Sequence, residues 1–169
     1  MARVRVSTKI GAPPEEVWAD IRDIGRHVEW MHDAESITFV TGQREGVGTR
    51  FTCETRVGPL HTSDRMVVTE WAHGERMGIR HEGVITGQGR FTLTPDGRGT
   101  CFTWEEELRF PWWLGGGFGA AVAAPVLARV WRRNLRALEQ RFTPRPERRA
   151  GPVDRLRSAV LPARSRGCG

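Results

Sequence analysis

The chain has 169 residues, a length that fits one domain with an appendage and allows a sizeable hydrophobic core. It contains no apolar run of the length that spans a membrane, and its first ten residues lack the apolar stretch of a secretion signal, so we expect a cytoplasmic protein. From residue 143 onward, seven arginines against two acidic residues carry most of the net charge of +6, which leaves residues 1–142 nearly neutral and argues against specific nucleic-acid binding.

The first part of the chain predicts a strand followed by two short helices. Residues 3–10 alternate valine with polar side chains, as a half-buried strand does. Two prolines and two glutamates at residues 13–16 suit the first turn of a helix, which we predict over residues 14–23. Gly25 is expected to end this helix, and residues 26–30 to form a second short helical turn.

The middle of the chain predicts an antiparallel meander. Six β-rich runs are separated by turn signals built on glycine, proline and aspartate. The predicted strands are residues 35–42, 48–57, 61–71, 76–83, 87–95 and 99–110. Short connections of this kind join neighbouring antiparallel strands, so the sheet has seven strands when the first one is included.

The last element is a long amphipathic helix over residues 117–142. Its apolar side chains recur close to helical spacing on one side, namely Phe118, Val122, Val126, Val130, Leu135, Leu138 and Phe142. Pro125 lies inside this helix and should bend its axis or divide it into two segments, because proline lacks the amide hydrogen.

This order of elements, with the segments "APPEEVW", "GVGTRF" and "GRGTCFTW", resembles the START-like (SRPBCC) superfamily and, within it, the polyketide cyclase/dehydrase group. The resemblance covers residues 1–142. It implies an α+β helix-grip fold, in which a curved seven-stranded antiparallel sheet wraps around the long C-terminal helix and encloses an apolar cavity. The two short helices would then close one end of the sheet, with Trp18 as their anchor and Trp30 at or near the cavity wall. Residues 143–169 would be a separate basic tail.

Strand parity selects the side chains that face this cavity, because alternate residues of a strand point to opposite faces. On each strand the more apolar set is expected to face inward. Together with Trp30, the predicted cavity residues are Phe51, Cys53, Met77, Ile79, His81, Phe91, Phe102, Trp104 and Glu106.

Two of these residues, His81 and Glu106, are ionisable. We expect Glu106 at the solvent-exposed rim, since carboxylates are rarely buried, and His81 as a half-buried structural histidine. If they point inward, they are weak candidates for a general acid or base. His27 and His32 are expected to be exposed. The cyclases that the chain resembles often polarise a ketone with an arginine and a tyrosine, and this chain has no tyrosine.

Residues 110–119, "FPWWLGGGFG", leave two alternatives open. Trp112 and Trp113 either fold onto the sheet edge or, with Phe118, form the mouth of the cavity. In the tail, apolar residues at positions 153, 156 and 160 suit weak contact with an anionic membrane surface, but the segment is short and we expect it to be disordered.

Three functions follow from these patterns. The first is binding of a hydrophobic small molecule such as a lipid, quinone or polyketide in the cavity. The second is a cyclase or dehydratase that uses His81 or Glu106 as acid or base. The third is recruitment of a macromolecule or membrane by the tail. We favour the first, which requires only the cavity. No cofactor or metal site is expected, because the three cysteines are widely spaced and no nucleophile or metal signature is present.

Overall fold

The computed structural model describes residues 1–114 and 116–143, without the side chains of Leu114 and Phe118. In chain order the elements are β1 (Ala2–Ile10), α1 (Pro14–Ile21), the 3-10 helix η1 (Ile24–Glu29), β2 (Ala34–Phe39), β3 (Arg50–Val57), β4 (Leu60–Ala72), β5 (Arg76–Glu82), β6 (Thr86–Asp96), β7 (Gly99–Arg109), the 3-10 helix η2 (Trp112–Leu114) and α2 (Gly116–Arg141). Apart from η2, which was not predicted, this order is the one that the sequence predicts, with boundaries that differ by at most a few residues.

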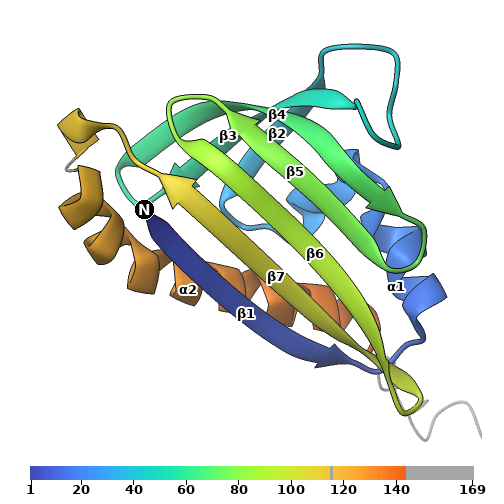
Figure 1. Ribbon diagram of the computed structural model, residues 1–169. Helices are drawn as coiled ribbons and strands as arrows, with labels where there is room; N and C mark the ends of the chain where they lie inside the picture. The colour runs from blue at the N-terminus through green and yellow to red at the C-terminus, as the bar shows by residue number, and fades with distance from the viewer. Residues whose placement is uncertain (115, 144–169) are drawn as a thin grey trace, which may run out of the picture.

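The strands form one antiparallel sheet in the order β1-β7-β6-β5-β4-β3-β2. Strands β2 to β7 are a meander, and β1 pairs with β7 at the far edge, so that Val6 lies opposite Trp104. Figure 1 shows the curved sheet with α2 running along one face, beside β1 and β7. The predicted helix-grip fold is therefore confirmed.

The helices α1 and η1 are held to the sheet by tryptophan. Trp18 is fully buried, its Nε1–H donates to Nδ1 of His73 at 3.1 Å, and its ring packs edge-on against Trp71. The first helix ends two residues earlier than predicted, at Ile21, because Asp23 leaves the helical conformation (φ −78°, ψ 88°). The prediction that Gly25 ends the helix is wrong, since Gly25 lies inside η1.

The buried face of α2 differs from the predicted face in its first half. Leu135 and Leu138 are buried as expected, but Val122 and Val126 are exposed, and Ala120 is buried instead. Val126 borders the cavity between α2 and the sheet, so it is exposed at the opening of that cavity although it lies on the expected face. The helix is continuous through the exposed Pro125, so proline does not divide it into two segments.

Even the longest described helix lacks an apolar stretch suited to crossing a bilayer. Of the predicted tail, residues 143–169, all but Thr143 lie outside the described residues, and the division into a domain and a tail stays a prediction.

Candidate ligand cavity

A cavity of about 270 Å³ lies between the inner face of the sheet, η1 and α2. Most of its wall is apolar. Eight of the ten residues expected there line it, namely Phe51, Cys53, Met77, Ile79, His81, Phe91, Trp104 and Glu106. The volume is close to the lower end of the range of about 300–1,000 Å³ found for small-molecule sites.

Trp30 and Phe102 do not line the cavity but support its wall from behind. Both are fully buried, and the ring of Trp30 lies 6.1 Å from Phe91, 6.5 Å from Phe102 and 6.2 Å from Trp104, measured between centroids. Rings at such distances and tilted to one another pack favourably. The segment that follows α1 thus contributes an aromatic plug that holds Phe91 and Trp104 in place.

The sheet and α2 meet at a stacked pair of indoles. Trp104 of β7 and Trp131 of α2 lie with ring centroids 4.9 Å apart and an interplanar angle of 22°. Both rings are buried and both line the cavity. The pair joins the sheet to α2 and contributes aromatic surface to the cavity wall.

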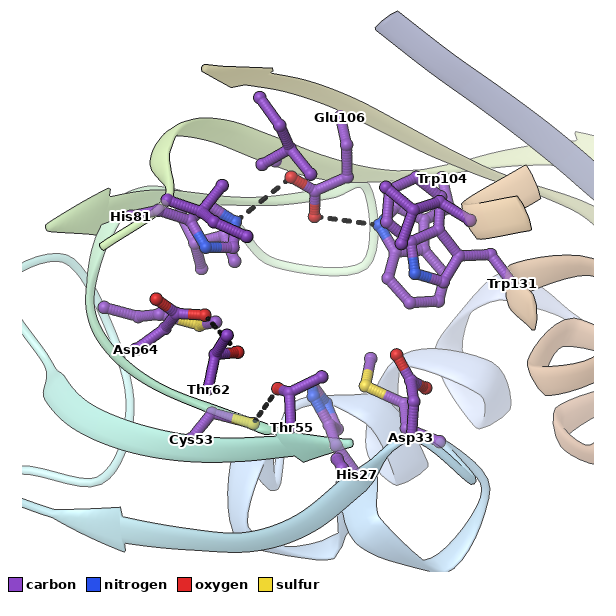
Figure 2. A pocket seen from close by; sticks show the side chains of 18 of the residues that line it. His27, Asp33, Cys53, Thr55, Thr62, Asp64, His81, Trp104, Glu106 and Trp131 are labelled. Carbon is purple, nitrogen blue, oxygen red and sulfur yellow. Dashed lines mark hydrogen bonds and ion pairs between the residues drawn. The ribbon is translucent and has the colours of Figure 1, made fainter. Parts of the chain in front are cut away.

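Glu106 lies inside the cavity, so its expected position at the solvent-exposed rim is wrong. Its side chain is only 5% exposed, one oxygen accepts from Trp104 Nε1 at 3.0 Å, and the other lies 3.1 Å from His81 Nε2 (Figure 2). Gly89 lies opposite Glu106 on β6, where an added Cβ would collide with the carboxyl group. A glycine at this position therefore leaves the space that the buried carboxyl group occupies.

The pairing with Glu106 controls the protonation of His81. Burial by itself lowers the pKa of His81, but the hydrogen bond and the negative charge of Glu106, helped by the charge of Asp64, outweigh it and raise the pKa above 6.5. The two residues thus form an acid–base pair within an apolar wall, which is the arrangement that proton transfer requires.

Asp64 of β4 is a second buried carboxyl group on the wall. It is 5% exposed, and its Oδ2 accepts from the hydroxyl of Thr62 at 3.1 Å, whereas its Oδ1 has no hydrogen-bond partner among the described residues. Figure 2 shows Asp64 and Thr62 across from Glu106 and Trp104. A Cβ added at Gly83 would collide with Oδ1, so a second glycine makes room for a second carboxyl group.

The loop before β2 brings a third acid to the cavity. Asp33 lines it, and Nδ2 of the fully buried Asn134 donates to Asp33 Oδ1 at 2.5 Å, while Asn134 Oδ1 accepts from the amide of His32 at 3.0 Å. Burial raises the pKa of Asp33 in spite of the hydrogen bond from Asn134. Asn134 therefore ties this loop to α2.

The two histidines beside Trp30 have different surroundings. His32 is exposed as expected, but His27 is buried and lines the cavity. Its Nε2–H donates to the carbonyl oxygen of Ile21 at 2.6 Å, which leaves Nδ1 unprotonated in the neutral ring. Burial lowers the pKa of His27, so the expectation of solvent exposure is wrong for this residue.

Trp112 and Trp113 are exposed, by 86% and 58%. The alternative that both indoles fold onto the sheet edge is therefore wrong. Figure 1 shows η2 at the end of the molecule where α2 begins, near the β5–β6 turn. The side chain of Phe118, the third residue predicted at the mouth, lies outside the described residues.

Comparison with known proteins agrees with this architecture. Residues 1–143 match the family described as polyketide cyclase/dehydrase and lipid transport. The chain belongs to this family. None of the curated proteins compared with it matches.

Several solved structures share the fold of this family member. The protein TTHA0849 of Thermus thermophilus is 23% identical, with a TM-score of 0.70 over 83% of this chain and 96% of the other. A START superfamily protein of Mycobacterium smegmatis is 12% identical, with a TM-score of 0.68 over 84% and 97%. The di-domain ARO/CYC protein BexL of the BE-7585A biosynthetic pathway is 15% identical, with a TM-score of 0.69 over 85% of this chain and 50% of the other. At these identities the likeness concerns the fold alone.

For this member of the family, sequence reasoning missed the polar residues that β4 contributes to the wall. The inner face of β4 carries Thr62 and Asp64 before Met66, so its pattern is not that of an apolar face. A β-bulge between Val68 and Glu70 further breaks its alternation. Gly83 could have served as a signal, because a glycine at the end of a strand often marks a position where another group approaches closely, and here that group is the carboxyl group of Asp64.

Trp131 and Asn134 of α2 were missed although they lie next to Val130 and Leu135, which were placed on the apolar side of the helix. Residues 131, 134, 135 and 138 are three and four apart and therefore share one face of the helix, and this spacing is the signal that could have included Trp131 and Asn134. Within residues 1–114 and 116–143, no three His, Cys, Asp or Glu side chains are placed to share a metal ion.

Proposed function

We propose that the protein binds a hydrophobic small molecule, such as a lipid, a quinone or a polyketide-like compound, in the cavity between the sheet and α2. The observation that carries the proposal is the cavity itself, about 270 Å³ in volume, with a wall that is mostly apolar and includes the stacked pair Trp104–Trp131. Burial of an apolar ligand there gains about 25 cal/mol for each Å² removed from water. The match to a family described by polyketide cyclisation, dehydration and lipid transport supports a ligand of this kind.

The entrance that we propose lies at the end of the molecule where α2 begins. Leu60 and Val126 line the cavity and are also exposed, which places them where it opens to solvent. The exposed indoles of Trp112 and Trp113 lie in the connection that leads into α2 (Figure 1). Exposed apolar side chains around an opening are typical of ligand entry sites.

The neutral dye N-phenyl-1-naphthylamine, whose fluorescence rises in apolar surroundings, tests the proposal. Replacement of Ile79, which lines the cavity, by tryptophan fills part of the volume and should weaken dye binding about tenfold or more. Val47→Trp is the matched control, because Val47 is exposed on a loop and does not line the cavity. Equal dye affinity in the Ile79→Trp variant, with an unchanged circular dichroism spectrum, would refute binding in this cavity. Native mass spectrometry of the purified protein would identify a co-purified ligand.

A second function, that of a cyclase or dehydratase, is favoured by one observation. His81 and Glu106 are hydrogen-bonded to each other within the cavity wall, and such a pair can move a proton to or from a bound carbonyl compound. If the pair is catalytic, His81→Gln should lower turnover of a ligand recovered from the protein by about 10²- to 10⁴-fold with its affinity intact. We expect instead that binding changes within about tenfold and that no such loss of turnover occurs.

A further inference from the structure

The charged groups on the cavity wall are predominantly acidic. Asp33, Asp64 and Glu106 all line the cavity. Among the described residues, Arg90 is the only arginine or lysine that lines it, and its side chain is half-exposed with Nε donating to Glu70 at 2.8 Å. The charge of Arg90 is therefore directed to the outer face of the sheet and not to the cavity.

The histidines do not offset this acidity. His81 is hydrogen-bonded to Glu106, so the positive charge of a protonated ring is balanced by the charge of that carboxyl group. His27 is buried with a lowered pKa and stays neutral. Burial raises the pKa of Asp33, which favours its neutral form. Asp64 acts on His81 through its charge, but among the described residues it accepts a hydrogen bond from neither a basic side chain nor an amide.

The hydrogen-bond partners of the three carboxyl groups also single out Asp64. Both oxygens of Glu106 have partners, whereas Asp33 and Asp64 each accept from one side chain, Asn134 and Thr62. Of these carboxyl groups, Asp64 is the one with a fully buried oxygen that has no partner in the described part of the chain. A buried acceptor without a donor is rare in folded proteins, and a bound group that supplies the donor recovers the cost of its burial. The oxygen of Asp64 that accepts from Thr62 has a second lone pair, with which it can also accept from a donor in the cavity.

We propose that the ligand carries a hydrogen-bond donor, a hydroxyl or an amine, on an otherwise apolar skeleton, that this donor binds Asp64 beside Thr62, and that the cavity rejects carboxylates. The inference rests on the proposed ligand-binding function and specifies its substrate class. A hydroxyl donates to Asp64 and can accept from Thr62, whereas an ammonium group adds an attraction of opposite charges. A free fatty acid or another carboxylate would place a second negative charge against Asp64 in a cavity of low dielectric.

Four naphthalenes of nearly equal size test this inference at pH 7 by displacement of N-phenyl-1-naphthylamine. They are 2-methylnaphthalene, 2-naphthol, 1-naphthylmethylamine and 2-naphthoate. With the wild-type protein, 2-naphthol should displace the dye at a concentration at least tenfold lower than 2-naphthoate, and more effectively than 2-methylnaphthalene. The amine distinguishes the two donor classes, because it binds more tightly than the naphthol only if a positively charged ligand is preferred.

Two variants assign the selectivity to Asp64. In Asp64→Asn, which keeps the shape of the side chain, the tenfold preference over naphthoate should fall to about twofold or less. In Asp64→Leu, the preference for naphthol over methylnaphthalene should also disappear. Asp96→Asn is the matched control, because Asp96 is outside the cavity and pairs with Lys9 at 2.6 Å, and it should keep the wild-type selectivity.

The outcomes separate the two proposals. If the dye and methylnaphthalene bind but naphthoate binds as tightly as naphthol, the inference about the donor is wrong while cavity binding stands. A preference for naphthol that survives in Asp64→Asn and Asp64→Leu likewise overturns the role of Asp64. If neither the dye nor any naphthalene binds, both proposals are wrong.

Discussion

Replacement of Glu106 tests the buried acid–base pair directly. Glu106→Ala removes the acceptor of Trp104 Nε1–H, and a buried donor left without a partner costs about 1–3 kcal/mol of folding free energy. Glu106→Gln keeps an oxygen for Trp104 and offers an amide hydrogen to His81, so it should cost less than about 1 kcal/mol. Urea denaturation at pH 7 measures both values. Glu105→Gln is the control, because Glu105 is on the outer face and pairs with Arg5.

The Glu106→Gln variant should also change the titration of His81. Glu106 is responsible for most of the increase in the pKa of His81, and without its charge the remaining effect of burial should bring the pKa below 6.5. Titration of the histidine ring signals by nuclear magnetic resonance follows this change, with His81→Gln to assign the signal. An identical titration of His81 in the wild type and in Glu106→Gln would refute the pair.

The sign of the pH dependence follows from linkage. Because the folded-state pKa of His81 is raised above 6.5, its stabilising contribution is fully present below pH 6.5 and is lost as the pH rises through the folded pKa. The lowered pKa of His27 has the opposite effect, since its contribution is present above pH 6.5 and is lost as the pH falls. His27 is common to the wild type and Glu106→Gln, so their difference in stability reports on the pair of His81 and Glu106, together with the smaller influence of Glu106 on Asp33. It should be largest below pH 6.5 and decline above it.

Three further predictions concern other parts of the molecule. Asn134→Ala should lower the free energy of unfolding, measured in urea, by about 1–3 kcal/mol, because it leaves Asp33 and the amide of His32 without partners in a buried site. A loss below about 0.5 kcal/mol, the size typical of surface substitutions, would contradict the role of Asn134 in tying the loop to α2. Burial raises the pKa of Cys53 to about 11, so iodoacetamide at pH 8 should modify Cys53 far more slowly than the less buried Cys101. Peptide mass spectrometry measures both rates, and equal rates would mean that the cavity opens freely. Removal of residues 144–169 should shift the melting temperature by only a few degrees, since the described core closes with α2, and calorimetry showing a large decrease would mean that these residues pack.

The order of the elements and the inner face of most strands could be predicted from the sequence because they depend on local periodicity. The alternation through Phe51 and Cys53 and that through Phe102 and Trp104 each have period two, and a half-buried strand has no other way to bury such a set. Helix starts are equally local, since the prolines and glutamates of residues 13–16 act on the first turn alone. These patterns are sufficient for the order of the elements and for the apolar faces of the strands, whereas the helix-grip arrangement was expected from the resemblance to the START-like superfamily.

Only the tertiary structure decided the polar part of the cavity. Whether Glu106 lies at the rim or inside depends on Gly89, which is distant in the chain but opposite it in the sheet, and on the nitrogen atoms of Trp104 and His81 that meet its oxygens. Asp64 likewise occupies space that Gly83 leaves beside the neighbouring strand. A buried carboxyl group is tolerated only where partners and space from several strands converge, and that convergence is absent from any local stretch of sequence.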